Sequence, residues 1–581
     1  MFTNSFRSNP IRNQLRYNLK NFKNPNNLKN LNNKRFYSEK SKYFPKESPR
    51  EVIGRFATWA ALFTIGLAYG SYRTVDKIHE HPLPHLFPNS SITPLDDLLK
   101  PVYGSTADFE KAFKEVIELL PEGHTSTSQS ELDHHSDTYW NSHHATDEQR
   151  PAMIVWPEST EEVSKILKIC NSYKIPVTPY SGGTSLEGHF IPTRGGICLD
   201  LNKMNHILSI NESDLDITLQ PSVGWEDLEE YLHPKGLLFG PDPGPGAEIG
   251  GMIATSCSGT NAARYGTMKE NVLSLTVVLA DGTIIKTKKR PRKSAAGYNL
   301  TGLFIGSEGT LGVVTEATLR LNVRPQNETV AVVPFPSIED AAKSVEQIVS
   351  KGIQVNAVEL LDDEMMKCIN ISGETSKTWV EKPTLFFKLA GSKNGLKEMV
   401  STVKDITKGN NGIDFEFANT EEERQELWAA RKVALWSTIN YGKTLNPDIQ
   451  VWTTDVAVPV SKLANVLKET KDDMKKSGLT ATLVGHVGDG NFHAFLLYDK
   501  ETRKTAEDLV ERMVHRALEN EGTCTGEHGV GYGKRDFLIN EIGQDPISLM
   551  RKIKMALDPN RILNADKVFR IDPDEPLVEH K

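Results

Sequence analysis

The hydrophobic pattern changes at about residue 150, where short apolar runs begin to alternate with amphipathic stretches. Residues 152–157 (AMIVWP) predict a strand, and Ser159 with Glu162 forms the capping-box pattern that begins a helix. The apolar residues of this helix fall on one face: Val163, Ile166, Leu167 and Cys170. Residues 175–180 (IPVTPY) predict a second strand, so the region predicts a βαβ unit.

A second pattern begins near residue 326, where strands alternate with longer amphipathic helices. The predicted strands are 329–335, 384–390, 455–460, 480–486 and 492–498, and the longest predicted helix is 421–440. This pattern predicts an antiparallel sheet covered by helices, which we place in a cap domain at 326–500. The C-terminal segment, 501–581, predicts helices around 502–520 and 546–557 that return toward the first region.

Length and composition limit the class of protein. At 581 residues the chain is too long for a single core, because single cores stop growing near ~250–300 residues. Hydrophobic residues make up 38% and charged residues 25%, which is typical of a globular body. The five cysteines are far apart and form no C-x-x-C pair, so no disulfide framework, iron–sulfur site or attached haem is indicated. No nucleic-acid partner is expected.

The N-terminal region differs from the rest in charge. Residues 1–38 carry eight basic side chains and no acidic one, so we predict a mitochondrial transit peptide at 1–37. Residues 56–72 are uncharged, and we predict a transmembrane anchor at 52–72. This order predicts a protein held in the inner mitochondrial membrane with its body in the intermembrane space. A disordered basic tail and a buried or surface helix are the alternatives for the two segments.

Residues 73–149 are interpreted as a linker with a short N-terminal helix at about 108–120. The stretch 134–144 (HHSDTYWNSHH) contains four histidines. Because no carboxylates at ligand spacing accompany them and the context is polar, we predict a solvated surface segment rather than a metal site.

Three glycine-rich segments follow the first predicted strands, at 181–189, 241–266 and 302–314. Glycine lets a backbone approach an anion closely, and consecutive N–H groups with small hydroxyls can cradle a pyrophosphate. The small residues of 241–266 are predicted to run flat against a large planar ligand. Three such segments in one region are more than ordinary turns require.

The motifs PYSGGTSLEGH, PDPGPGAEIGGMIATSCSGTNA and GSEGTLGVVT resemble the FAD-binding domain of the vanillyl-alcohol oxidase family. The resemblance implies an α+β fold, with an FAD-binding domain at 150–325 and an antiparallel-sheet α+β cap domain for the substrate. Thr184 stands where members with covalent flavin carry a histidine, so non-covalent FAD is expected. No G-x-G-x-x-G follows a strand, which argues against NAD. The resemblance assigns these residues to FAD: Ser181, Gly182, Gly183, Thr184, Ser185, Pro241, Gly246, Gly250, Gly251, Ser256, Gly259, Asn261, Gly312 and Val314.

The second half carries the motif HVGDGNFH at 486–493. If 488–491 form a hairpin turn, His486 lies opposite His493 and both imidazoles share one face, with Cβ atoms ~5 Å apart. Two imidazole nitrogens suit a zinc ion. Downstream, glycines bracket Glu527 and His528, which allows a bend at which Glu527 adds a carboxylate ligand while His528 stays free as an acid or base.

HVGDGNFH and GTCTGEHGVG are similar to the metal and catalytic segments of the FAD-linked D-2-hydroxy-acid dehydrogenases, a branch of the same family. By this resemblance a divalent metal, zinc or manganese, binds to His486, His493 and Glu527. His528 is then the general base, and Arg431, in the predicted helix WAARKVAL, holds the substrate carboxylate. A surface arginine is the alternative for Arg431.

The resemblance implies hydride transfer from C2 of a small D-2-hydroxy acid to the flavin. D-lactate is the expected substrate, because Thr453 stands where hydroxyglutarate-type members carry a lysine and no second cation is identified. D-2-hydroxyglutarate and glycolate are alternatives. Without a haem or iron–sulfur motif the electrons must pass to another carrier, and cytochrome c is expected. Two alternatives come from other functional classes, a zinc hydrolase and a flavin-binding protein without turnover, and both would use the same residues.

Overall fold

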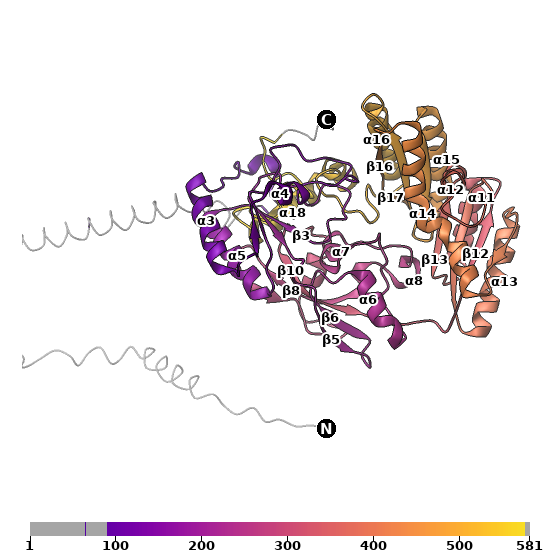
Figure 1. The fold of residues 1–581 in the computed structure, drawn as a ribbon, viewed down its shortest axis with the longest axis horizontal. Helices are drawn as coiled ribbons and strands as arrows, with labels where there is room; N and C mark the ends of the chain where they lie inside the picture. The colour runs from indigo at the N-terminus through magenta and orange to yellow at the C-terminus, as the bar shows by residue number, and fades with distance from the viewer. Residues whose placement is uncertain (1–63, 65–89, 576–581) are drawn as a thin grey trace, which may run out of the picture. The chain divides into compact units, whose positions relative to one another are not determined.

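The computed structural model describes residue 64 and residues 90–575, and the chain divides into two compact units, 1–86 and 87–581. The predicted transit peptide (1–37) lies outside the described residues, as does the predicted anchor (52–72) apart from Thr64. In the described part of the chain, no helix combines the length and the apolar character needed to span a bilayer. The labelled elements of Figure 1 belong to the second unit.

A small sheet in the order β1-β2-β4-β3 opens the second unit. The predicted βαβ unit is confirmed with one difference: β4 lies between β2 and β3, and the three strands are parallel. Ser159 accepts a hydrogen bond from the Glu162 N–H, but the Glu162 carboxylate accepts from the Glu158 N–H instead of Ser159, so only half of the predicted capping box forms. The elements are β1 (Thr125–Ser126), β2 (Met153–Val155), α5 (Thr160–Tyr173), β3 (Val177–Tyr180) and β4 (Ile197–Asp200).

A five-stranded antiparallel sheet, ordered β5-β6-β10-β8-β9, forms the second layer of the region before the cap, which we call the first half. Its apolar face packs against α6 (Trp225–Leu232), α7 (Ile249–Thr255) and α10 (Leu300–Phe304). The third glycine-rich segment leads from α10 directly into β10, which fixes that segment at the edge of a buried strand. The strands are β5 (Ile207–Asn211), β6 (Asp216–Leu219), β8 (Val272–Val278), β9 (Ile284–Lys286) and β10 (Val313–Arg320).

The cap is an antiparallel sheet in the order β15-β12-β14-β13-β18-β19-β16, with β17 also paired to β19. The prediction missed β13, β15 and β16, and the predicted strand 455–460 is mostly wrong, because Pro459 caps α15 and only two residues pair. The strands are β12 (Asn327–Pro334), β13 (Ala357–Leu361), β14 (Thr384–Gly391), β15 (Glu416–Phe417), β16 (Gln450–Thr453), β17 (Val456–Ala457), β18 (Ala481–Gly485) and β19 (Asn491–Tyr498).

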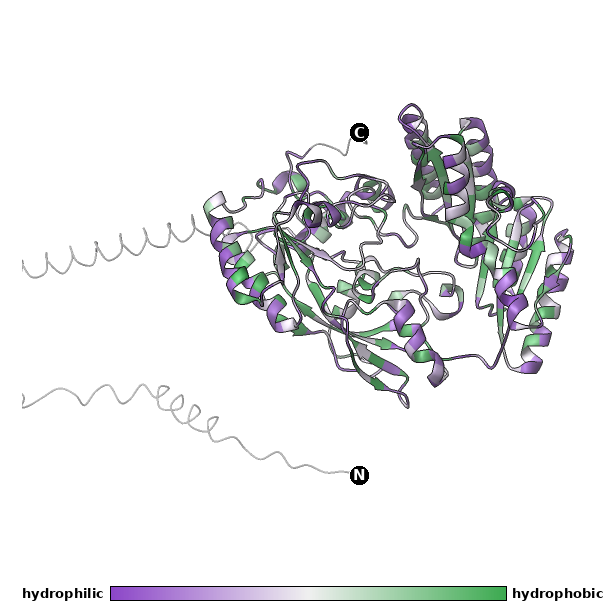
Figure 2. Ribbon diagram, in the orientation of Figure 1, coloured by the Kyte–Doolittle hydropathy of each residue, from purple (hydrophilic) through white to green (hydrophobic). Residues whose placement is uncertain are grey.

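Helices cover both faces of the cap sheet, because alternate residues of its strands enter two separate cores (Figures 1 and 2). Phe387 enters one core and its neighbour Phe386 the other. The first core contains α11 (Ile338–Ser350), α13 (Lys393–Gly409), α15 (Val460–Ser477) and α16 (Arg503–Glu519), and the second contains α12 (Asp363–Ser372) and α14 (Glu421–Leu445).

Only the second of the two C-terminal helices predicted to return does so. Helix α16 packs on the cap, whereas Ile553 and Leu557 of α18 (Gln544–Leu557) pack against the core of the first half. The buried Lys554 ammonium donates to the Thr310 and Leu563 carbonyls and to Asp558, each at 2.6 Å. This lysine therefore ties the C-terminal helix to the glycine-rich turn before β10.

The histidine-rich stretch 134–144 is not a solvated segment, so that prediction is wrong. His135 and His143 are buried, with 4% and 7% of their surface exposed. His135 Nε2 lies 3.1 Å from Asp200 Oδ2, at the end of β4, and its ring lies against Tyr180 of β3. The stretch packs on the body because its histidines find partners there, a tertiary contact that its polar composition does not indicate.

We predict that Asp558→Ala destabilises the protein by about 3–5 kcal/mol, because it leaves the buried Lys554 without its carboxylate and also removes the acceptor of two backbone N–H groups. A lowered midpoint of thermal unfolding checks this. Asp545→Ala, at an exposed position in the first turn of the same helix, is the control and should cost only about 0.3–1 kcal/mol. Equal shifts in the two variants would contradict the argument.

Candidate active site

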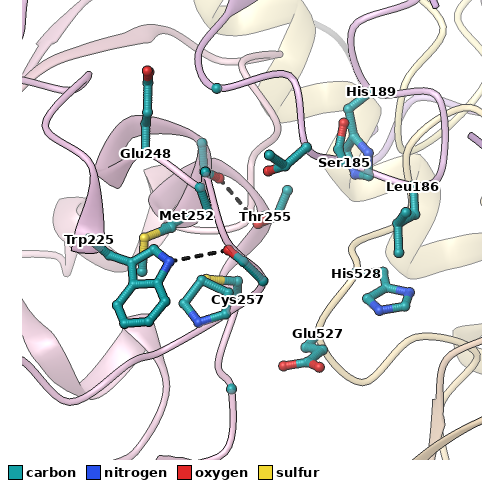
Figure 3. Close-up of a pocket in the computed structure, with 18 of the residues that line it drawn as sticks. Ser185, Leu186, His189, Trp225, Glu248, Met252, Thr255, Cys257, Glu527 and His528 are labelled. Atoms are coloured by element: carbon teal, nitrogen blue, oxygen red, sulfur yellow. Dashed lines mark hydrogen bonds between the residues drawn. The ribbon is translucent and has the colours of Figure 1, made fainter. Parts of the chain in front are cut away.

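A cavity of about 1020 Å³ lies between the first half and the cap. The loop after β3, helix α7 and the turn before β10 form one side, and β14, α14, β18, β19 and the Glu527-His528 loop form the other. In Figure 3, Glu527 and His528 lie across an open space from Trp225 and Cys257. The three glycine-rich segments and the histidine motif therefore meet at one site, although they are far apart in the sequence.

The first glycine-rich segment lines the cavity through Ser181, Gly182, Thr184 and Ser185. Gly183 does not belong to the wall. Its φ is +64°, and a Cβ there would lie 2.0 Å from the Tyr180 hydroxyl, so glycine is needed at this position to pack the turn on β3.

The second glycine-rich segment is folded differently from the prediction. Instead of running flat, its middle forms α7, and a Cβ on Gly250 would meet Pro221 at 2.7 Å. Gly246, Gly250, Gly251 and Gly259 line the cavity, but Pro241, Ser256 and Asn261 do not. The Asn261 N–H, for example, donates to Asp242 at 2.8 Å. Asn261 therefore shapes the segment instead of the cavity wall.

The third segment has a role that the sequence did not reveal. Gly312 and Val314 line the cavity. The preceding Glu308 has φ +53°, and its carboxylate accepts hydrogen bonds from the Val530 and Gly531 N–H groups at 2.7 and 2.8 Å. The turn thus holds the chain just after His528.

The two motif histidines share one face, but by a different register from the predicted one. Val484, not His486, pairs with His493, and residues 487–489 form a 3₁₀ turn. His486 lies two residues beyond Val484 and so points to the same face. The rings are 5.5 Å apart and nearly perpendicular.

Glu527 completes a three-residue group with these histidines. Its Oε1 lies 2.9 Å from His486 Nε2 and 3.3 Å from His493 Nε2, and Ser258 of the opposite half donates to its Oε2 at 2.6 Å. Each histidine is oriented through Nδ1: that of His486 contacts Glu359 at 2.8 Å, and that of His493 contacts the Thr454 carbonyl at 3.0 Å. Both Nε2 atoms are therefore directed at one carboxylate oxygen.

The charges of His486, Glu527 and Glu359 shift one another's pKa values. Burial favours neutral forms, but Glu359 and Glu527 outweigh it and raise the pKa of His486 well above its usual value. In the same way His486 lowers the pKa of Glu527 despite burial, and His486 with Arg431 lowers that of Glu359. A positive charge between these two carboxylates is therefore strongly favoured, whether a proton or a cation supplies it.

His528 lies on the same wall in a different state. Its ring stacks on His493 with centroids 4.9 Å apart. Burial, with the nearby His493 and Lys534, outweighs the attraction of Asp455 and lowers the pKa of His528 to about 3. The imidazole is therefore neutral at physiological pH.

Arg431 reaches the cavity from α14, with its side chain 20% exposed. Its Nε donates to Glu359 Oε2 at 2.8 Å, and no contact within residues 90–575 uses its two terminal nitrogens. Glu359 was missed because β13 was not predicted. Lys388 and Lys432 also line the cavity, so cations other than Arg431 are present. Lys388 lies over the Trp428 ring and 4.0 Å from Asp242, whereas Lys432 is exposed.

Comparison with known proteins identifies the fold and family. The FAD binding domain model matches residues 151–288, and the model of the C-terminal domain of FAD linked oxidases matches 324–568. The p-cresol methylhydroxylase structure and the 4-ethylphenol oxidase from Gulosibacter chungangensis each align with a TM-score of 0.67 at 19% identity, covering 82% of this chain and 99% of theirs. These likenesses confirm the predicted two-domain α+β fold of the vanillyl-alcohol oxidase type.

Several relatives are much more similar in sequence. The mitochondrial D-lactate dehydrogenase [cytochrome] of Kluyveromyces lactis is 60% identical over 84% of this chain and 85% of its own length. The mitochondrial D-lactate dehydrogenase [cytochrome] 1 of Saccharomyces cerevisiae is 57% identical over 81% of each chain. A glycolate oxidase subunit of Bacillus subtilis is only 34% identical. This chain therefore belongs to the FAD-linked oxidase family, in the group of the mitochondrial cytochrome-linked D-lactate dehydrogenases.

Proposed function

We propose that this chain is an FAD-dependent dehydrogenase that oxidises D-lactate to pyruvate and passes the electrons to cytochrome c. One observation carries the proposal: a neutral His528 lies on the cavity wall beside the His486–His493–Glu527 group and the free fork of Arg431. The names of the Kluyveromyces and Saccharomyces relatives support the substrate and the acceptor.

The cavity suits non-covalent FAD. The hydroxyls of Thr184 and Ser185 and the glycines of α7 can face a pyrophosphate, and Thr184 leaves no histidine for covalent attachment at that position. When bound, the flavin supplies the hydride acceptor.

We also propose a divalent metal, zinc or manganese, held by His486, His493 and Glu527. Ligating histidines in metal sites are usually oriented through their second nitrogen, and here Glu359 and the Thr454 carbonyl do so. The ligand atoms lie within 4.8 Å of one another. When bound, the metal would acidify the substrate hydroxyl.

The remaining chemistry falls to side chains of the chain itself. Arg431 can bind the substrate carboxylate through two parallel hydrogen bonds, because Glu359 fixes its Nε and leaves its terminal nitrogens free. His528, neutral on the same wall, would accept the hydroxyl proton. Thr453, where a lysine would be needed for a distal carboxylate, lies on the wall and favours a substrate with one carboxylate over D-2-hydroxyglutarate.

We predict that His528→Ala keeps FAD but slows its reduction by D-lactate about 10²- to 10⁴-fold. The substitution removes the proposed base, whereas the proposed contacts to FAD remain. Stopped-flow absorption of the flavin band measures this. His515→Ala, on the exposed side of α16, is the control and should react at the wild-type rate. Near-normal reduction in His528→Ala would rule out its role as the base.

We predict that His486→Ala loses the metal and most turnover, while the exposed His134→Ala retains both. Elemental analysis of the purified proteins gives the metal content. Undiminished metal in His486→Ala, or no metal in the wild type, would contradict the proposed site.

We propose that the mature body is anchored by 52–72 in the inner mitochondrial membrane and faces the intermembrane space. Removal of the eight basic groups of 1–37 leaves 60 basic residues from 68, against 76 acidic ones, a formal charge of −16.

We predict that cytochrome c reduction falls steeply with added salt, because the Debye length shrinks from ~10 Å at 0.1 M to ~3 Å at 1 M. Reduction of a neutral dye should change little, and equal salt dependence of the two rates would refute electrostatic docking.

A further inference from the structure

A strongly basic segment stands out from the acidic body of this protein. It runs from β9 through the following loop to the first residue of α10, residues 284–300, and contains no aspartate or glutamate. Every residue from 291 to 300 is exposed. Six basic side chains lie within eight positions: Lys286, Lys288, Lys289, Arg290, Arg292 and Lys293.

Little in the described protein neutralises this charge. Arg290 binds the carboxylates of Asp214 and Asp216, and Arg292 donates to the Asp214 carbonyl. Within residues 90–575, no ion pair joins the four lysines of the segment to an acidic side chain. The charges of the four lysines and of Arg292 are therefore available to an anionic partner.

Apolar side chains lie among the charges. Tyr298 is 94% exposed, Ile284 43% and Leu300 39%. A partner that matches both features offers anionic groups next to hydrocarbon. The interface of a lipid bilayer has this character, since tyrosine and aliphatic side chains enter the headgroup boundary while lysines contact anionic lipids.

We propose that segment 284–300 docks on a membrane surface rich in anionic phospholipid. The uncharged sequence 56–72, which we propose as an anchor, would hold the chain at a bilayer. Charge argues against cytochrome c as the occupant, because a basic protein is repelled by this segment. The proposal does not depend on the reaction at the cavity.

Chymotrypsin cleavage after Tyr298 tests the proposal with the full chain, reconstituted in vesicles of phosphatidylcholine alone or with a third of phosphatidylglycerol. We expect the anionic vesicles to slow this cleavage at least about tenfold relative to the neutral ones. The variant Lys288→Gln/Lys289→Gln/Arg292→Gln/Lys293→Gln keeps Tyr298 and should lose the protection. Retained FAD shows that the variant is folded.

A matched control removes four exposed lysines of α13: Lys393→Gln/Lys397→Gln/Lys404→Gln/Lys408→Gln. It changes the net charge equally and should keep the protection. Protection that is equal in neutral vesicles, or that survives neutralisation of 288–293, would overturn the proposal. Protection by RNA or polyglutamate but not by anionic vesicles would also overturn it and assign the segment to an acidic macromolecule.

Discussion

One buried carboxylate, Asp455, holds the part of the molecule on which the chemistry depends. It accepts the backbone N–H groups of both Glu527 and His528 at 2.9 Å, and it also bonds Asn491 and Thr525. Burial would raise its pKa, but the charged Lys534 ammonium beside it helps to outweigh burial, and the pKa of Asp455 is lowered. Because the backbone is fixed at two successive residues, Glu527 faces the histidine pair while His528 stacks on His493.

Two further carboxylates extend this constraint across the molecule. Glu308 of the first half holds the chain after His528, and Glu359 of the cap joins Arg431 to His486. Buried charges are costly to bring out of water, and each is retained here with several partners. Through these contacts the three carboxylates join the first half, the Glu527-His528 loop and Arg431.

Much of the site could be predicted because its motifs carry local chemistry. The glycine segments, the HVGDGNFH motif and the Glu527-His528 pair all reach the cavity, even though the register of the histidines was predicted wrongly. Glu308, Glu359 and Asp455 were not found, because their functions depend on partners that are distant in sequence. The burial of His135 and His143 was missed for the same reason. Small residues such as Gly183 were assigned to the cofactor, although their close contacts are with the protein.

The central claim is that, at a site with an arginine fork and a flavin cavity, His528 would take the hydroxyl proton of D-lactate while bound flavin would take the hydride from C2. An anaerobic titration of the purified FAD-loaded protein with D-lactate, read at the flavin absorption band, tests it most directly. The account predicts that the band is bleached, that pyruvate forms in an amount equal to the FAD reduced, and that D-2-hydroxyglutarate bleaches it far more slowly. A flavin band that D-lactate leaves unchanged would contradict the account.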